Sequence, residues 1–285
     1  MSKPASLKVG PFTTNVLVKK RYLLFYLFLF WVALFTIQFE FWIYYHYLST
    51  EIILFYVLLP FLLIFLYISS VFVSLLFAKF LLFCVNLIHK PREGVFLRDK
   101  NDIDYRYWSI RNTIKKWPVW LSHKFPFPFL DNLCFKMFGV KTRFKNSLFE
   151  GWVDTEFIEF GENVTVGEGS IIQSALIAGN LFIIRKTEIG NNVEIGSHAI
   201  LMPGTKIGDN CIVAASSTTT VGQELESGWI YLGVPATKFK KNRFFDDNLE
   251  DLIGDSEDIE NLREKYDLVY VKRKDKEKIQ KNSPE

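Results

Sequence analysis

His198 is the histidine of this chain whose setting best suits proton transfer. It lies between Ile195 and Ala199, two positions of a regular apolar pattern that should point inward, so its own side chain should point outward. A histidine held at a surface can act as a general base and take the proton of a hydroxyl or an amine during group transfer. A surface histidine without a catalytic role is the alternative that the sequence leaves open.

The segment around His198 is a repeat array in which apolar residues return every six positions. These anchors are Phe160, Val166, Ile172, Ile183, Ile189, Ile195, Leu201, Ile207 and Val213. A second inward set lies four positions after most anchors, at Val164, Ser170, Thr187, Val193, Ala199, Thr205, Cys211 and Ser217. This period predicts a parallel β-solenoid, because only stacked coils of short strands bury a continuous core. The step from Ile172 to Ile183 is eleven residues instead of twelve, which predicts a bulge or loop.

Three motifs resemble the bacterial hexapeptide-repeat acyltransferases: IGNNVEIGSH at residues 189–198, MPGTKIGDN at 202–210 and GVPA at 233–236. The resemblance implies a mainly β fold, a left-handed parallel β-helix. It also implies acetyl-CoA as the acyl donor, a histidine as the base and a homotrimer with its sites between subunits.

Within that family the Ile-Gly-Ser-His segment most resembles the sugar O-acetyltransferases. Their catalytic histidine lies on an earlier coil, and the matching region here, residues 173–180, contains no histidine. His198 is therefore the candidate base, and Gln173 and Ser174 are candidate substrate contacts. An enzyme impaired by the loss of its base is the alternative.

The resemblance also assigns the contacts with CoA. It places them at Ser197, Ala215 and Thr220, partly through main-chain amides, and places the loop over the pantetheine arm at Gly233, Pro235 and Ala236. Three lysines follow at once, Lys238, Lys240 and Lys241, and would suit the nucleotide phosphates. Surface charge or attraction to lipid headgroups is the alternative for these lysines.

Two apolar stretches near the N-terminus are long enough to cross a bilayer. Residues 22–39 and 52–78 carry no charge, and an aromatic cluster at 42–47 suits a membrane interface. Glu40 is expected to reach the headgroups. Basic residues flank both outer ends of this hairpin and the turn has none, so both termini and the β-helix should be cytoplasmic.

The remaining segments complete a five-part organisation. We predict an N-terminal tail (1–18), a transmembrane hairpin (19–89), an interfacial helical linker (90–147), the β-helix (148–240) and a charged C-terminal segment (241–285) whose acidic part covers the open end of the coil. Apolar residues from Ile103 to Leu121 predict an amphipathic helix with Arg106, Arg111, Lys115 and Lys116 off its apolar stripe. It could lie on an anionic bilayer or pack on the hairpin. Asp131 should cap a short helix that ends at Gly139.

Composition excludes several classes of function. A net charge of +3 gives no basis for nucleic-acid binding, and the three cysteines lack metal-ligand or disulfide spacing. A zinc carbonic anhydrase built on this coil would need three metal-binding histidines at each site. The coil has one histidine, so no metal is expected. The sequence predicts a membrane-anchored, acetyl-CoA-dependent O-acetyltransferase that acts on a lipid-linked or surface-glycan precursor. The alternative is a non-catalytic membrane-anchored scaffold.

Overall fold

The computed structural model describes residues 20–99, 101–125, 129–148 and 151–242. Residues up to Lys240 form one compact unit, which is described below, and later residues form a second. The predictions for the N-terminal tail, for an extended connector around residues 126–128 and for a helical cap after residue 242 lie outside the described residues.

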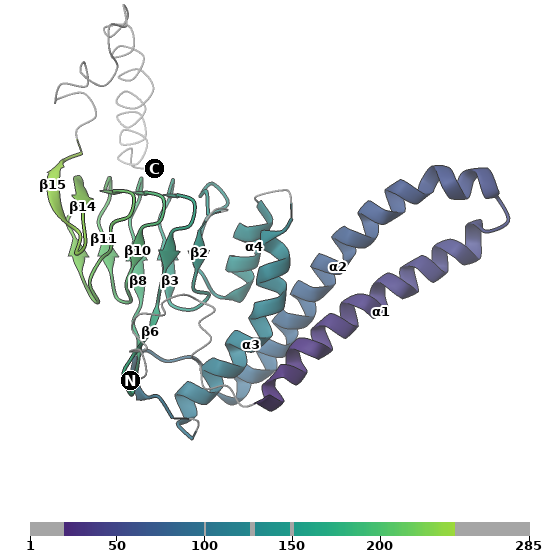
Figure 1. Ribbon diagram of the computed structural model, residues 1–285, viewed down its shortest axis with the longest axis horizontal. Coiled ribbons are helices and arrows are strands. Elements are labelled where there is room, and N and C mark those ends of the chain that lie inside the picture. Colours follow the sequence, from purple (N-terminus) through teal and green to yellow (C-terminus); the bar gives the residue numbers. More distant parts are fainter. Residues whose placement is uncertain (1–19, 100, 126–128, 149–150, 243–285) are drawn as a thin grey trace, which may run out of the picture. The chain divides into compact units, whose positions relative to one another are not determined.

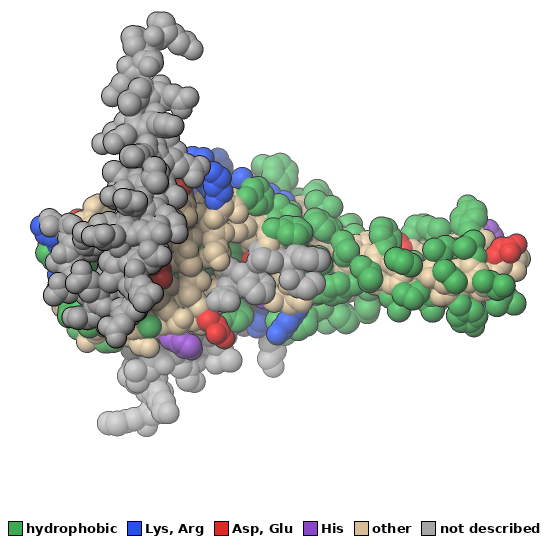
Figure 2. Space-filling view, turned by 90° about the horizontal axis from the view of Figure 1, so that it is seen from above, with side chains coloured by type: hydrophobic (Ala, Val, Ile, Leu, Met, Phe, Trp, Pro, Cys, Tyr) green, Lys and Arg blue, Asp and Glu red, His purple; other side chains and the backbone are tan. Residues whose placement is uncertain are grey.

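Two long helices form an antiparallel hairpin at the start of the described chain. A short 3-10 turn, Lys20–Tyr22, leads into α1 (Leu23–Leu48), and α2 (Ile52–Ile88) follows after a tight break. Both helices are long and apolar enough to cross a membrane. Only Leu29, Val32 and Ala33 of α1 are buried, and hydrophobic side chains cover the visible face of the hairpin (Figure 2). Glu40 does not behave as expected, because its Oε1 accepts a hydrogen bond of 2.5 Å from Ser69 on α2 and so faces the partner helix.

Two further helices pack against this hairpin. α3 (Ile103–His123) begins after Asp102, whose carboxylate caps the helix by accepting from the backbone N–H of Tyr105, and α4 (Phe129–Phe138) follows. Their core joins Val71 and Leu75 of α2 to Ile114 of α3 and Leu130 of α4. The apolar stripe of α3 therefore packs on the hairpin, which is the second of the two placements that the sequence allowed.

Arg111 and Lys115 of α3 do not face lipid, because both are buried and both contact Glu156. The expectation for Asp131 is wrong. Asp131 is not a cap, because α4 begins two residues before it and its carboxylate lies 3.1 Å from His123 Nδ1. The helix ends at Phe138, and Gly139 follows it with a φ of +117°, which suits a residue without a Cβ.

The C-terminal part of the unit is a three-sided coil of short parallel strands (Figure 1). The first sheet has the order β13-β11-β8-β3, from Glu224–Leu225, Lys206–Ile207, Thr187–Ile189 and Ile158–Phe160. The second has the order β15-β14-β12-β9-β4, from Thr237–Lys241, Trp229–Leu232, Ile212–Val213, Glu194–Ile195 and Thr165–Val166. The third has the order β10-β5-β2, from Ile200–Leu201, Ile171–Ile172 and Trp152–Val153. Ile189 pairs with Ile207, so one coil takes 18 residues.

The predicted inward residues line one shared interior. Ile189, Ile195, Leu201, Ile207 and Val213 belong to one buried cluster, together with inward Val193, Ala199 and Cys211. Buried hydroxyls in this interior bond to backbone carbonyls, as Ser170 does to Gly196 and Thr205 does to Met202. The coil begins earlier than residue 148, because Lys141 and Ser147 already bridge to Glu159 and Thr165.

Ile183 is not an anchor of the coil, and this part of the predicted ladder is wrong. Phe160 pairs with Ile189, 29 positions later, so 11 residues are inserted into an 18-residue coil. The insertion forms the hairpin β6 (Ala175–Ala178) and β7 (Leu181–Ile184), which pairs with β1 (Gly94–Leu97) ahead of α3. Phe182 and Ile184 are buried against Tyr105 of α3, so the hairpin docks the coil onto the helical layer.

Trimming one methyl group inside the coil should cost measurable stability. Ile195 is 1% exposed, so Ile195→Val should lower the free energy of unfolding by about 1 kcal/mol, because the interior cannot close around the gap. Ile212→Val is the matched control, since Ile212 is only partly buried. Thermal unfolding in detergent measures both; an equal effect of the two changes would show that Ile195 does not line the core.

Candidate active site

His198 lies at an exposed corner between the second and third sheets. Its backbone has a φ of +59°, and its N–H donates to the carbonyl of Glu168 on the coil before, at 2.9 Å. Ser216, one coil later, has the same left-handed conformation. The corner itself therefore requires this backbone, and it turns the imidazole outward as the sequence predicted.

The imidazole of His198 lies directly against Gly169 on the preceding coil. A Cβ added at Gly169 would come within 3.0 Å of His198 Nε2, and Gly169 itself has a φ of +68°. The absence of a side chain at position 169 thus leaves room for the ring. Sequence reasoning did not single out Gly169.

Ser197 and Ala215 occupy equivalent positions on adjacent coils at this corner, and both are exposed. The backbones are tightly stacked here, since a Cβ at Gly196 would lie 2.4 Å from the nitrogen of Ala215. No acceptor for the backbone N–H of Ser197 or of Ala215 occurs among the described residues. These two amides are free to bind an external acceptor.

The corner between the first and second sheets differs in this respect. There the N–H groups of Glu162, Asn191 and Asp209 are each capped by a side-chain oxygen of the next coil. An asparagine ladder runs beside them, from Asn163 through Asn192 to Asn210. One corner is closed by its own side chains, and the His198 corner leaves its amides open.

The predicted closing turn lies against the third side of the coil. Thr218 donates its N–H to the carbonyl of Gly233 and accepts from the N–H of Ala236, at 3.0 and 2.8 Å. Gln223 joins this turn to Thr220, because its Nε2 donates to Ala236 O and its Oε1 accepts from the N–H of Thr220. The structure thus brings Thr220 and Ala236 together through Gln223, while Pro235 stays exposed.

The three lysines after the turn are not equivalent. Lys238 pairs with Glu226 at 2.6 Å, and its Nζ lies 4.8 Å from the ring centre of Trp229. Lys240 and Lys241 are exposed in β15. A phosphate would have to compete with Glu226 for Lys238.

Gln173 and Ser174 are buried at the root of the inserted hairpin, with 3% and 2% exposure. Asp154, which sequence reasoning did not single out, accepts from the N–H groups of Ser174 and Ala175 at 2.8 and 3.2 Å. The structure therefore places both predicted substrate contacts under the hairpin rather than at the His198 corner. The region where the resemblance expects the base instead docks the helical layer.

Asp154 should make stability depend on pH. Burial raises the pKa of its carboxyl from 3.8 to about 6, although the amides of Ser174 and Ala175 and the charge of Lys115 act against the rise. The folded protein thus holds this proton more tightly than the unfolded chain does. The protonated carboxyl contributes its full stabilisation below about pH 4, and this contribution is lost as the pH rises through about 6. The loss amounts to about 3 kcal/mol in the free energy of unfolding.

Asp154→Asn tests this prediction, because the amide oxygen can still accept from the backbone while the charge is gone. Thermal unfolding at a series of pH values should show the difference in stability, variant minus wild type, rising between pH 4 and 6. A difference that stays constant over this range would contradict the raised pKa.

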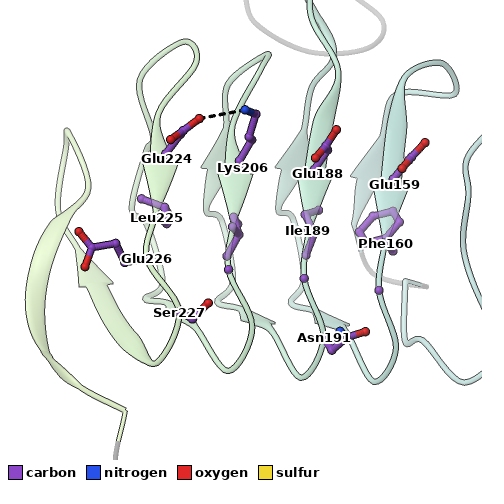
Figure 3. Close-up of a pocket in the computed structure, with 14 residues that line it drawn as sticks. Glu159, Phe160, Glu188, Ile189, Asn191, Lys206, Glu224, Leu225, Glu226 and Ser227 are labelled. Atoms are coloured by element: carbon purple, nitrogen blue, oxygen red, sulfur yellow. Dashed lines mark hydrogen bonds and ion pairs between the residues drawn. The ribbon is translucent and has the colours of Figure 1, made fainter.

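An open groove of about 850 Å³ runs over the outer face of the first sheet. Figure 3 shows Glu159, Glu188, Lys206 and Glu224 in a row on successive strands, with Lys206 bonded to Glu224. Four glutamates and one lysine line the groove, and each glutamate pairs with a lysine, so the groove offers no unpaired cation among the described residues for the phosphates of a nucleotide. The His198 corner suits an anionic carrier better.

Comparisons with known proteins agree with this geometry. Residues 186–220 match the family described as bacterial transferase hexapeptide (six repeats). These residues form part of the coil. The fold prediction, a left-handed parallel β-helix preceded by two apolar helices, is confirmed.

Several relatives that match the coil are named acetyltransferases. The chain is 49% identical over 67 residues to a probable macrolide acetyltransferase of Lysinibacillus sphaericus, covering 24% of this chain and 36% of the relative. It is 43% identical over 67 residues to a chloramphenicol acetyltransferase of Klebsiella aerogenes, covering 24% and 30%. A maltose O-acetyltransferase structure from Clostridium difficile 630 is 18% identical with a TM-score of 0.35, covering 45% and 84%. The chain thus spans about a third of the length of the curated relatives it matches.

Proposed function

We propose that this protein is a membrane-anchored acetyltransferase that transfers an acetyl group from acetyl-CoA to a hydroxyl. The observation that carries the proposal is the corner of the coil, where an exposed histidine lies beside two uncapped backbone amides on adjacent coils. A general base takes the acceptor's proton in acyl transfer, and open main-chain amides can hold an anionic carrier. The names of the acetyltransferase relatives indicate that the acyl group is acetyl.

The reaction needs one proton carrier. Neutral His198 takes the proton of the acceptor hydroxyl while the hydroxyl oxygen forms a bond to the thioester carbonyl carbon. The carbon–sulfur bond then breaks, and the imidazolium returns the proton to the sulfur of CoA. The amides of Ser197 and Ala215 and the turn at 233–236 hold the carrier, and Lys240 and Lys241 lie next to that turn in sequence for its phosphates.

The anchor and the assembly belong to the same proposal. α1 and α2 cross the bilayer, with both termini and the coil on the cytoplasmic side, as the distribution of basic residues indicates. The acceptor is a lipid-linked or surface-glycan precursor within reach of that anchor. The resemblance implies a homotrimer, in which a neighbouring subunit completes the site at the His198 corner.

Acetyl-CoA binding and turnover test the proposal with the full chain in detergent or nanodiscs. We expect acetyl-CoA to raise the unfolding temperature and free CoA to appear when a sugar acceptor is added. A protein that binds no CoA would instead be a scaffold.

Gly169→Ala should slow acetyl transfer without removing any functional side chain. Its Cβ would displace the His198 ring, so we expect kcat to fall about 10- to 100-fold. Gly179→Ala is the matched control, because Gly179 also has a positive φ, +59°, but an added Cβ there meets open space. If both changes alter kcat equally, the position of the His198 ring does not matter for catalysis.

A further inference from the structure

A second cavity, of about 550 Å³, lies where the helical layer meets the coil. α2 contributes Lys79, Leu82, Phe83 and Asn86, and the other walls come from α3, the end of α4 and the start of the coil. This cavity is separate from the His198 corner and from the groove of Figure 3, with which it shares only Glu159.

The position of the cavity is set by α2. Residues 52–78 of this helix carry no charge, and Lys79 is the first charged residue after them. With α2 spanning the bilayer, as proposed above, the cavity begins where the helix enters the headgroup layer. Phe83 lies one turn further along and is 59% exposed, so the cavity has an apolar wall that faces the same layer.

The opposite wall is polar and carries excess positive charge. Five cations line the cavity, Lys79, Arg111, Lys115, Lys141 and Lys186, against three carboxylates, Glu93, Glu156 and Glu159, and Lys186 also pairs with Glu188 outside the lining. Arg111 and Lys115 share one oxygen, Glu156 Oε1, at 2.8 and 2.5 Å. Lys79 donates to the carbonyl of Met137, which leaves its charge without a carboxylate partner among the described residues. Such a wall suits a phosphate.

Two residues that line the cavity each carry a buried acceptor atom with no hydrogen-bond partner among the described residues. The two atoms are Glu156 Oε2, on a side chain that is 11% exposed, and Asn86 Oδ1. A buried acceptor left without a donor is costly, so a ligand that fits here brings donors such as hydroxyl groups. The cavity therefore joins three features: an apolar wall at the bilayer, surplus cations and unpaired acceptors.

We infer that this cavity binds the headgroup of a membrane amphiphile that carries both a phosphate and hydroxyl groups. Its phosphate contacts Lys79 and the neighbouring cations, its hydroxyls donate to Glu156 and Asn86, and its chain lies along Phe83. The inference rests on the proposed function in one respect: the bound lipid would belong to the class of acceptor that the membrane-anchored acetyltransferase uses.

Binding of short-chain lipids by the full chain in neutral detergent tests the inference. The probes are dioctanoyl-phosphatidylinositol, which has phosphate and hydroxyls, dioctanoyl-phosphatidic acid, which has no hydroxyls on its headgroup, and dioctanoyl-phosphatidylcholine. We expect phosphatidylinositol to bind about tenfold more tightly than phosphatidylcholine. Inositol phosphate without acyl chains should bind more weakly than the lipid; equal binding would show that the site takes a soluble phosphate and would overturn the lipid assignment.

Two variants locate the binding in this cavity. Lys79→Ala should weaken phosphatidylinositol binding about tenfold, whereas Lys124→Ala, which removes an exposed lysine outside the cavity, should leave it unchanged. Asn86→Leu should weaken binding of phosphatidylinositol but not of phosphatidic acid. Equal effects of the two lysine changes would mean general charge attraction and would overturn the inference.

The same variants distinguish a failure of the lipid site from a failure of the proposed function. Acetyl-CoA binding is measured on each variant and should not change, because the His198 corner is untouched. A protein that binds acetyl-CoA but shows no preference for phosphatidylinositol overturns the lipid site alone.

Discussion

Replacing His198 with alanine should lower the rate of acetyl transfer about 10²- to 10⁴-fold and leave acetyl-CoA binding unchanged. The imidazole is the proposed general base at the open corner, while the neighbouring backbone amides bind the carrier. Removing the ring removes the base and keeps those amides. The loss should therefore appear in kcat rather than in the affinity for acetyl-CoA.

CoA release measured with a thiol reagent gives the rate, and a thermal-shift titration gives the affinity. Asn192→Ala is the control, because Asn192 lies on the same coil at the other corner and also has a positive φ, +53°. Full activity of the His198→Ala protein would remove this residue from the mechanism.

Replacing Glu156 with glutamine should destabilise the protein by about 3–5 kcal/mol. Arg111 and Lys115 are 2% and 4% exposed, and Glu156 is the carboxylate that both contact. Burial alone would raise the pKa of Glu156, but Lys115 and Arg111 outweigh it and hold the pKa below its usual range. Burial lowers the pKa of Lys115 despite this pairing. Without the carboxylate, two buried cations would lie side by side uncompensated.

Thermal unfolding of the full chain in detergent measures this cost. Glu162→Gln provides the comparison, because Glu162 pairs with Arg143 at 3.1 Å while both side chains are more than half exposed. Such an exposed pair should contribute less than about 1 kcal/mol. If the two variants unfold at the same temperature, Glu156 does not hold α3 to the coil.

The coil could be predicted from sequence because its register repeats. Each inward position packs against the equivalent position one coil away, so Ile189, Ile195 and Leu201 are all buried in the same interior. Ile183 was misassigned because it happens to precede Ile189 by six residues, although it belongs to a hairpin with alternating burial. A period measured along the chain cannot show that an insertion leaves the coil.

The candidate site was predictable only in part. The outward direction of His198 follows from the repeat, whereas Ser197 and Ala215 were assigned to CoA by the family resemblance. That the amides of Ser197 and Ala215 are left open does not follow from the repeat, since it depends on which side chains lie at that corner. Contacts distant in sequence, such as Glu156 with Arg111 and Lys115, or Asp154 with the hairpin, leave no local pattern.

Hydrogen–deuterium exchange with and without acetyl-CoA tests the central claim most directly. The account predicts that acetyl-CoA slows exchange at the backbone amides of Ser197 and Ala215 and in the turn at 233–236, while the amides of Asn191 and Asp209 at the capped corner do not change. Protection confined to the groove of the first sheet, or no protection anywhere in the coil, would contradict it.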